Sequence, residues 1–487
     1  MTLSRTGTLA GLVALTFTAA ACGNDLTGLN KNPNAPTDVD AEFLFPQGVT
    51  SVVRLVRGAG FDLHLTSLWA QHYAKIQYVD EDWYQIRPGD IDGYWTSFYA
   101  GGLQDLTTTI EKAEADTRLG ANKGNFTAPP TIMKAWTFGA MTDVWGDIPY
   151  SEANLGAAGT ITPKYDTQAS IYDGMLASLS AATASIVPTG DSYGSADPVY
   201  GGDMNKWRAF SNSLRLRYAM RLSKVNAAKA QTEFAAAMAA AGGVFTSNAN
   251  NAQIVWPGDG TNDNPFFTNF RTRDDHRVSK AMVDTLKSLN DPRLAVYARP
   301  TAADPTQYVG VQNGLVTSDA AQLGLTRTSK IGLFFSSKSS PSVLMAYSEV
   351  LFIRAEAAAR GWGGNAAALY IEAITASMKV YGISDAAIAA YLAQPAVVYN
   401  PATGLTQIAL QKWISLFNQG SEAYAEWRRT GVPTLTPGPA AVTNPKVVAR
   451  RLTYPLLEQS LNPANLTAAM TAQPGVKLED RVWWDKP

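Results

Sequence analysis

Aromatic and charged side chains lie close together between residues 78 and 95, in a pattern typical of surfaces that bind sugars. A pyranose has an apolar face and a polar rim, so an exposed ring can stack on that face while neighbouring polar groups bind the hydroxyls. The same rings could instead be local packing. We predict that this first cluster lines a ligand surface, with seven contributors: Tyr78, Asp80, Trp83, Tyr84, Arg87, Tyr94 and Trp95.

A second cluster of the same kind follows between residues 256 and 273. Its predicted ligand-binding members are Trp256, Asn264, Phe267, Arg271 and Arg273, and packing is again the alternative. Calcium is the one ion this run could hold, on Asp259, Asn262 and Asp263. The run lacks the alternating ligand spacing and the terminal Glu of an EF-hand loop, so we expect no cofactor and no metal.

Catalytic signatures are missing from the sequence. It contains no phosphate-binding loop, no HExxH and no GxSxG motif, and three histidines and one cysteine are too few for a typical zinc cluster. A helical glycoside hydrolase would need only two carboxylates, such as Asp143 with Asp147 or Glu349 with Glu356. Structural roles are more common for such residues, with Asp147 capping a turn and Glu356 joining two helices. We expect no enzymatic activity.

The charge of the chain argues against nucleic acid as a partner. Its 487 residues carry 40 Lys and Arg against 41 Asp and Glu, a formal net charge of −1. A non-specific nucleic-acid binder would need an excess of positive charge. The apolar fraction of 46% is sufficient for a large core.

The first 22 residues resemble the export signal of a bacterial lipoprotein. An uncharged, mostly apolar run from 9 to 21 follows Arg5 and is too short to span a bilayer, which predicts a signal peptide over 1–21. Cys22 comes directly after three alanines, where a lipoprotein cysteine is acylated, although Ala19 stands where Leu or Val is usual. Simple cleavage that leaves a free thiol is the alternative. Asn and Pro recur in 22–40, which predicts a tether rather than a helix or strand. With an acylated Cys22 as its first residue, this tether would be lipidated.

The rest of the chain, 41–487, is predicted to be a single, mainly α-helical domain. Apolar residues recur with helical spacing in 132–140, 171–182 and 207–218, where Arg208 and Arg215 should point outward. The clearest helical pair covers 350–374, with small residues that allow the close approach seen in tetratricopeptide-type hairpins. Long excursions rich in Gly, Asn, Asp and Pro separate the helices at 191–203, 245–272 and 300–340. Such long loops are usually functional or disordered.

Several segments resemble motifs of the SusD/RagB family of outer-membrane nutrient-binding lipoproteins. Residues 143–153, DVWGDIPYSEA, closely resemble the family's fGDvPYseA element. Further similar segments follow in the family's order, and they run from the leader to the last residues of the chain: 32–34, 207–223, 286–294, 347–362, 418–433, 450–465 and 482–485.

The resemblance implies four tetratricopeptide-like helical hairpins packed against an irregular, ligand-bearing part. It also implies a surface-exposed protein, held by lipid on the outer membrane, that captures oligosaccharides or other polymers for a SusC-like TonB-dependent transporter without cleaving them. The alternatives are a peptide or other nutrient binder of the same family, the helical hydrolase, or a scaffold that contacts only protein. Ligand residues vary within the family, so the predicted site depends on the loop aromatics.

Overall fold

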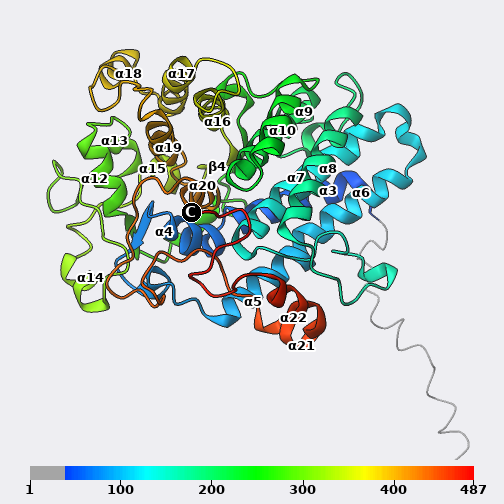
Figure 1. The fold of residues 1–487 in the computed structure, drawn as a ribbon, viewed down its shortest axis with the longest axis horizontal. Coiled ribbons are helices and arrows are strands. Elements are labelled where there is room, and N and C mark those ends of the chain that lie inside the picture. Colours follow the sequence, from blue (N-terminus) through cyan, green and yellow to red (C-terminus); the bar gives the residue numbers. More distant parts are fainter. Residues whose placement is uncertain (1–38) are drawn as a thin grey trace, which may run out of the picture. The chain divides into compact units, whose positions relative to one another are not determined.

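A computed structural model describes residues 39–487, and most of these residues are helical, as predicted (Figure 1). The predicted signal peptide, Cys22 and the predicted tether up to residue 38 lie outside the described residues. Ala41–Pro487 form one unit.

The longer helices pack mostly as neighbours in sequence. In the first half, α3 packs on α6, α6 on α7, α7 on α8, α8 on α9, and α9 on α10. In Figure 1 these helices lie on the right and α12, α13 and α18 on the left. The helices of this half are α3 (Ala41–Val56), α6 (Gln104–Ala115), α7 (Lys123–Trp145), α8 (Gln168–Ser185), α9 (Met204–Arg221) and α10 (Ala227–Ala239).

Helical hairpins recur in the second half. The pair predicted at 350–374 is confirmed, because α16 packs closely on α17 through small, fully buried residues such as Ala355 and Ala373. Helix α19 packs on α16 and α20. The helices of this half are α16 (Tyr347–Ala359), α17 (Ala366–Lys379), α18 (Asp385–Leu392), α19 (Gly404–Ser415) and α20 (Gly420–Thr430).

Side-chain caps and glycines fix where these helices begin and end. The carboxylate of Asp203 accepts hydrogen bonds from the backbone N–H groups of Asn205 (3.1 Å) and Lys206 (3.2 Å), which starts α9. Helix α20 ends at Gly431, whose φ of 73° is a left-handed conformation that favours glycine.

Helix α9 corrects one sequence prediction. Arg215 is buried, because α10 covers it and Glu233 of that helix lies 3.7 Å from its guanidinium, and Arg208 is half-buried. A helix packed on several neighbours buries nearly all of its faces, so its polar residues do not mark a solvent side.

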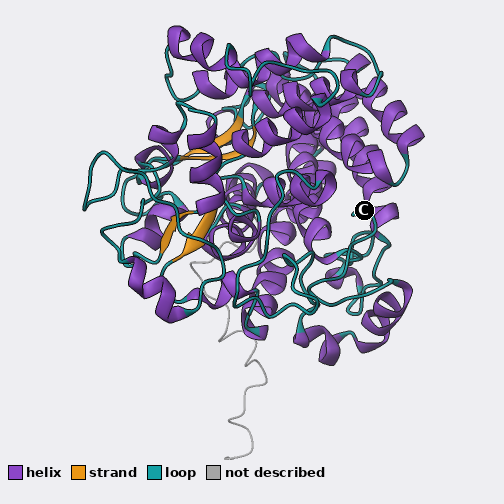
Figure 2. Ribbon diagram, turned by 60° about the vertical axis from the view of Figure 1, so that its left-hand side comes forward, coloured by secondary structure: helices purple, strands orange, loops and turns teal. Residues whose placement is uncertain are grey.

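Short elements occupy the segments between the long helices. Two antiparallel strand pairs, β1 with β3 and β2 with β4, lie among helices (Figure 2). The strands are β1 (Tyr73–Lys75), β2 (Ala252–Val255), β3 (His276–Val278) and β4 (Pro341–Met345). The short helices are α4 (Ser67–Trp69), α5 (Pro88–Thr96), α11 (Pro265–Phe270), α12 (Lys280–Ser288), α13 (Leu294–Tyr297), α14 (Thr317–Leu323), α15 (Leu333–Ser336), α21 (Leu456–Leu461) and α22 (Pro463–Ala472). Two π-helices, η1 (Ala59–Thr66) and η3 (Ser97–Leu103), and the 3₁₀ turns η2 (Val79–Trp83), η4 (Thr117–Asn122), η5 (Gly156–Ala158), η6 (Gly194–Ala196), η7 (Leu222–Lys224) and η8 (Asn248–Asn250) complete the described chain.

Candidate ligand-binding site

The β1–β3 pair brings the two predicted clusters together. Its strands run antiparallel with Lys75 opposite His276, and the next backbone hydrogen bond joins Ile76 N–H to the Asp275 carbonyl oxygen at 2.8 Å. Because the strands are antiparallel, the end of β1 lies beside the start of β3. Residue 78, shortly after β1, and residue 273, shortly before β3, are therefore close together. As a result, the Arg273 guanidinium carbon lies 5.1 Å from the centre of the Tyr78 ring.

Tyr78 presents the exposed ring that a sugar site needs. The residue is 65% exposed and has a left-handed backbone, with φ of 51°, at the start of η2. A cation over an aromatic face at this distance contributes about 0.5–1 kcal/mol at an exposed site. Arg273 thus helps to hold the ring while much of the residue remains accessible.

A pocket of about 320 Å³ lies beside this pair. Part of its wall comes from Phe270, the last residue of α11, and from Arg271 and Arg273 in the turn that follows. A second part comes from Arg299 and Lys330, which are neighbours because Ala298 and Ile331 form an isolated β-bridge. The pocket is therefore built by segments that lie up to about 60 residues apart in sequence.

Asp274 is the carboxylate of the pocket wall. It receives the Lys330 ammonium at 2.9 Å and the Arg277 guanidinium at 3.0 Å. Partial burial works against its charged form, but the hydrogen bonds and charges of these two cations outweigh that effect, so the pKa of Asp274 lies below its usual value. Asp274 is thus a carboxylate that already has two cationic partners.

Two stacked histidines lie at the inner side of the pocket. The rings of His64 and His276 are 5.0 Å apart and nearly parallel, and His276 contributes to the pocket wall. Burial lowers the pKa of both histidines, that of His64 to about 3. Within the described residues, Nε2 of His276 has no hydrogen-bond partner. The histidine face of the pocket is consequently neutral at physiological pH.

The other members of the first cluster divide into accessible and buried residues. Asp80 and Trp83 are half-buried in η2, where the indole N–H of Trp83 donates to the Leu315 carbonyl oxygen at 2.7 Å. Arg87 is exposed directly before α5. Tyr94 is half-buried, and its hydroxyl donates to the Gly60 carbonyl oxygen at 3.2 Å.

Two rings of the first cluster do not line a surface. Tyr84 is 2% exposed and packs edge-on against Trp69, and Trp95 is 4% exposed and packs edge-on against Trp145. Both belong to the main core, so their placement contradicts the predicted contact with ligand. In α5 the buried residues are Ile91 and Trp95, which lie four positions apart and so share one side of the helix.

Two members of the second cluster are structural as well. Trp256 is 2% exposed, donates its indole N–H to the Ser342 hydroxyl at 2.9 Å, and lies under the Arg54 guanidinium. Asn264 is the cap of α11, since its side-chain oxygen accepts from two backbone N–H groups. Both are buried between β2, α11 and β4 and are unsuited to bind ligand. Phe267 is half-buried on α11, while Arg271 and Arg273 are exposed.

Arg299 and Lys330 are pocket residues that sequence reasoning missed. Arg299 comes directly before the long 300–340 excursion and Lys330 lies within it. No motif or cluster in the neighbouring sequence marks either residue as part of a site. Only the bridge between Ala298 and Ile331 places them opposite Arg271.

The Asp259 run forms a closed turn. Asp259 accepts hydrogen bonds from the backbone N–H groups of Thr261 (2.8 Å) and Asn262 (2.7 Å), and Asp263 accepts from Gly260 (2.9 Å). Among residues 39–487, no group of three or more His, Cys, Asp or Glu side chains is arranged to hold a metal ion.

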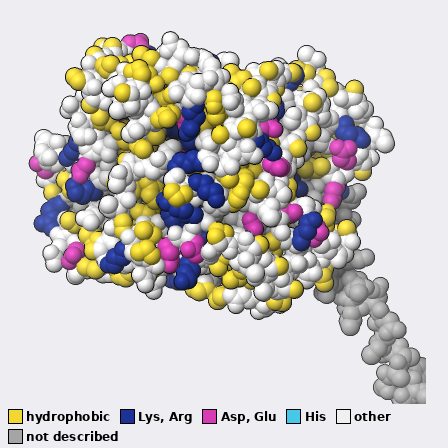
Figure 3. Space-filling model, in the orientation of Figure 1, with side chains coloured by type: hydrophobic (Ala, Val, Ile, Leu, Met, Phe, Trp, Pro, Cys, Tyr) yellow, Lys and Arg dark blue, Asp and Glu magenta, His cyan; other side chains and the backbone are white. Residues whose placement is uncertain are grey.

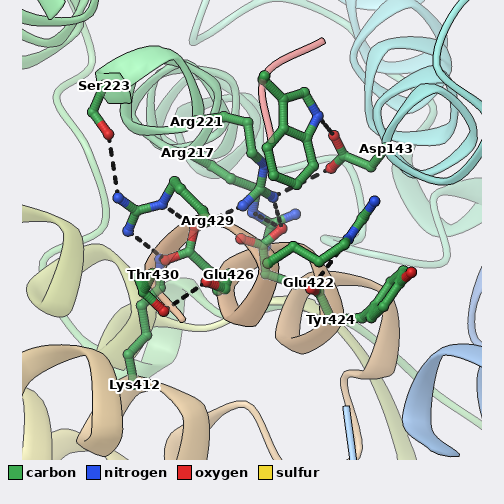
Figure 4. A network of polar contacts seen from close by, with 12 residues as sticks. Asp143, Arg217, Arg221, Ser223, Lys412, Glu422, Tyr424, Glu426, Arg429 and Thr430 are labelled. Carbon is green, nitrogen blue, oxygen red and sulfur yellow. Dashed lines mark hydrogen bonds and ion pairs between the residues drawn. The ribbon is translucent and has the colours of Figure 1, made fainter. Parts of the chain in front are cut away.

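The carboxylates considered for hydrolysis lie in the core. Each of three belongs to a buried ion pair between helices: Asp143 with Arg221 at 3.3 Å (Figure 4), Glu349 with Arg217 at 2.7 Å, and Glu356 with Arg429 at 2.6 Å. The fourth, Asp147, accepts from the backbone N–H of Gln168 at 2.7 Å at the start of α8. Asp143, Glu349 and Glu356 therefore serve to join helices.

Comparison with known proteins identifies the family. Residues 33–455 match the SusD-like family described as "starch-binding associating with outer membrane". The chain belongs to this family. No curated protein matches it.

Solved structures of SusD-like proteins share the fold. A "chitin-binding protein" is 29% identical, with a TM-score of 0.79 over 91% of this chain and 100% of that one. A chitin-binding SusD homolog from Flavobacterium johnsoniae is 26% identical, with a TM-score of 0.79 over 91% and 98%. A SusD homolog from Bacteroides uniformis is 25% identical, with a TM-score of 0.79 over 91% and 100%.

The family is one of binding proteins associated with the outer membrane. Within residues 39–487 of this SusD-like protein, no helix combines the length and the apolar character needed to cross a bilayer.

Proposed function

We propose that this SusD-like protein is a surface lipoprotein that captures oligosaccharides and delivers them to a SusC-like TonB-dependent transporter in the outer membrane. The observation that carries the proposal is the exposed Tyr78 ring, which contacts Arg273, a side chain that lines a polar pocket. The family is described as starch-binding and two relatives as chitin-binding, which supports a glycan as the ligand.

The geometry suits binding without cleavage. An aromatic ring can take the apolar face of a pyranose, and the guanidinium and hydroxyl groups of the pocket wall can bind the sugar hydroxyls. Three of the carboxylates considered for hydrolysis, Asp143, Glu349 and Glu356, are engaged in buried ion pairs. A binder that is tethered beside its transporter also works at modest affinity, because delivery then occurs at a high effective concentration.

Titration of the purified protein with a panel of oligosaccharides tests the site. We expect Tyr78→Ala to weaken binding by about tenfold, the loss expected when one stacked ring is removed. Phe43→Ala is the matched control, because Phe43 is also 65% exposed but lies on α3. Equal affinities for wild type and Tyr78→Ala would move the site elsewhere, and release of reducing ends from the panel would indicate a hydrolase instead.

The anchor and the partner have their own experiment. We expect labelled palmitate to mark wild type but not Cys22→Ala, and the wild-type protein to co-purify from outer membranes with a large TonB-dependent barrel. Equal labelling of Cys22→Ala would exclude the lipid anchor.

A further inference from the structure

Positive charge dominates the pocket beside Tyr78. Four cationic side chains contribute to its wall, and the only carboxylate among its lining residues is Asp274. The cations are Arg271, Arg273, Arg299 and Lys330. This local excess contrasts with the near-neutral charge of the whole chain.

Most of this charge has no anionic partner among residues 39–487. Asp274 pairs with Lys330 and with Arg277. The side chains of Arg271 and Arg273 take part in no ion pair or side-chain hydrogen bond in the described part of the chain, apart from the contact of Arg273 with Tyr78. Their backbone N–H groups donate to Phe267 (3.0 Å) and Asn269 (3.1 Å), which orders the turn that carries them.

In another basic region of the molecule, the arginines pair with a carboxylate of the protein. On the face drawn in Figure 3, basic side chains gather near the middle, close to where Figure 1 marks the C-terminal end. Near that end of the chain, Arg450 and Arg481 both pair with Asp485. Arginines that pair with a carboxylate in this way stabilise the fold. Arg271 and Arg273 instead line a pocket and have no carboxylate partner in the described part of the chain.

Arg299 adds a partly desolvated cation. Its Nε–H donates to the Ile331 carbonyl oxygen at 2.9 Å, which fixes the guanidinium at the pocket wall. Burial lowers its pKa, and the charge of Asp274 offsets only part of that effect. An anion that enters the pocket would compensate this cost, because guanidinium groups bind carboxylates and sulfates through paired, charge-assisted hydrogen bonds.

We propose that the glycan captured at this site is acidic, with carboxylate or sulfate groups on its sugar units that bind Arg271, Arg273 and Arg299 while a ring stacks on Tyr78. The proposal rests on the proposed glycan-binding function and names the substrate class of that same site. Lys330, already paired with Asp274, contributes the remaining positive charge.

Binding measured by calorimetry with matched oligosaccharides tests the charge. The panel pairs oligogalacturonate with its methyl ester, and sulfated with desulfated chondroitin oligosaccharides, and adds neutral malto- and chito-oligosaccharides. We expect at least one acidic member to bind about tenfold more tightly than its uncharged or less charged match, and to lose affinity as salt rises. The first pair reports on carboxylates and the second on sulfates.

Variants locate the effect. We expect the double variant Arg271→Gln with Arg273→Gln to lose about tenfold or more in affinity for the acidic ligand. Arg118→Gln is the matched control, because that arginine is exposed on η4. A circular dichroism spectrum and melting temperature equal to those of wild type would show that the double variant is folded.

The outcomes separate the two proposals. If neutral oligosaccharides bind as tightly as acidic ones, or the double variant keeps full affinity for the acidic ligand, the acidic class is overturned while glycan binding stands. If no oligosaccharide in the panel binds, both are overturned.

Discussion

His72 is buried beside Trp413, whose carbonyl oxygen lies 3.1 Å from Nε2 of the histidine. Burial lowers the pKa of His72 from 6.5 to about 3, and the hydrogen bond with Trp413 offsets only part of this effect. The imidazole is therefore neutral in the folded protein at any pH at which the protein functions.

Acid should destabilise the protein through this residue. Between pH 6.5 and about 3 the unfolded chain binds a proton at His72 and the folded chain does not, so stability is complete above pH 6.5 and falls as the pH drops. The loss is up to about 1.4 kcal/mol per pH unit for one such group. We expect urea denaturation at pH 7.5, 6 and 5 to show a smaller loss for His72→Gln than for wild type.

The glutamine can still donate to Trp413, which makes the variant a fair comparison. Parallel pH dependence in the two proteins would contradict the prediction. An independent check is the NMR titration of the wild-type His72 ring, which should show no protonation down to about pH 5.

Local composition identified Tyr78, Arg271 and Arg273, but it could not tell exposed rings from buried ones. Trp95 lies among acidic residues and is buried all the same, because α5 turns that one side chain towards Trp145. Arg299 could not be found, since its place in the pocket depends on a β-bridge to a residue 33 positions after Ala298. Burial and pairing between distant segments depend on the whole fold, so the type of a single residue and its neighbours in sequence do not predict them.

At the scale of elements, close contact between helices depends on glycine at particular positions. Gly139 lies in the middle of α7, where Tyr218 of α9 packs directly against it. A Cβ atom there would lie 2.3 Å from the Tyr218 hydroxyl oxygen and 2.8 Å from its ring. Tyr218 cannot easily move, because it is buried and its hydroxyl donates to the Ala135 carbonyl oxygen at 3.0 Å.

Overpacking usually costs about 1–3 kcal/mol, so after the gain in helix propensity we expect Gly139→Ala to destabilise the protein by up to about 2 kcal/mol. The gain in helix propensity, about 1 kcal/mol, offsets only part of that cost. Chemical denaturation at pH 7.5 measures the change.

Gly93→Ala is the matched control for the helix. Gly93 lies in α5, and a Cβ atom there would meet no other atom within 4 Å. We expect this substitution to stabilise the protein by about 0.4–1 kcal/mol. Stabilisation by both substitutions would show that α7 and α9 have room to move apart.

Sequence periodicity predicted the long helices well and the short strands not at all. The pattern in 350–374 gave both α16 and α17, because helices of 13 and 14 residues are long enough to repeat their apolar positions. Strands β1 and β3 have three residues each and lie about 200 residues apart, too short for an alternating pattern to be recognised. Yet it is this pair that places Tyr78 beside Arg273.

At the scale of the whole described unit, a buried ion network joins helices from both halves of the chain (Figure 4). Arg221 of α9 contacts Glu422 at 2.7 Å and Glu426 at 2.6 Å, both on α20. Lys412 of α19 and Arg429 of α20 also pair with Glu426, each at 2.8 Å. Glu426 thus has three cationic partners, whose charges outweigh its burial and hold its pKa well below the usual value.

Removal of the negative charge of Glu426 should affect the unit as a whole. Glu426→Gln keeps the shape of the side chain but leaves three buried cations with less compensation, which typically costs about 3–5 kcal/mol. Glu114→Gln is the same change at an exposed pair, where Lys123 lies 3.7 Å away, and should cost no more than about 1 kcal/mol. We expect urea denaturation at pH 7.5 to show a single transition for both variants, shifted strongly only for Glu426→Gln. A second, earlier transition in Glu426→Gln would contradict the expected single transition and show that the halves unfold separately once the network is weakened. Similar midpoints for the two variants would show that Glu426 is dispensable.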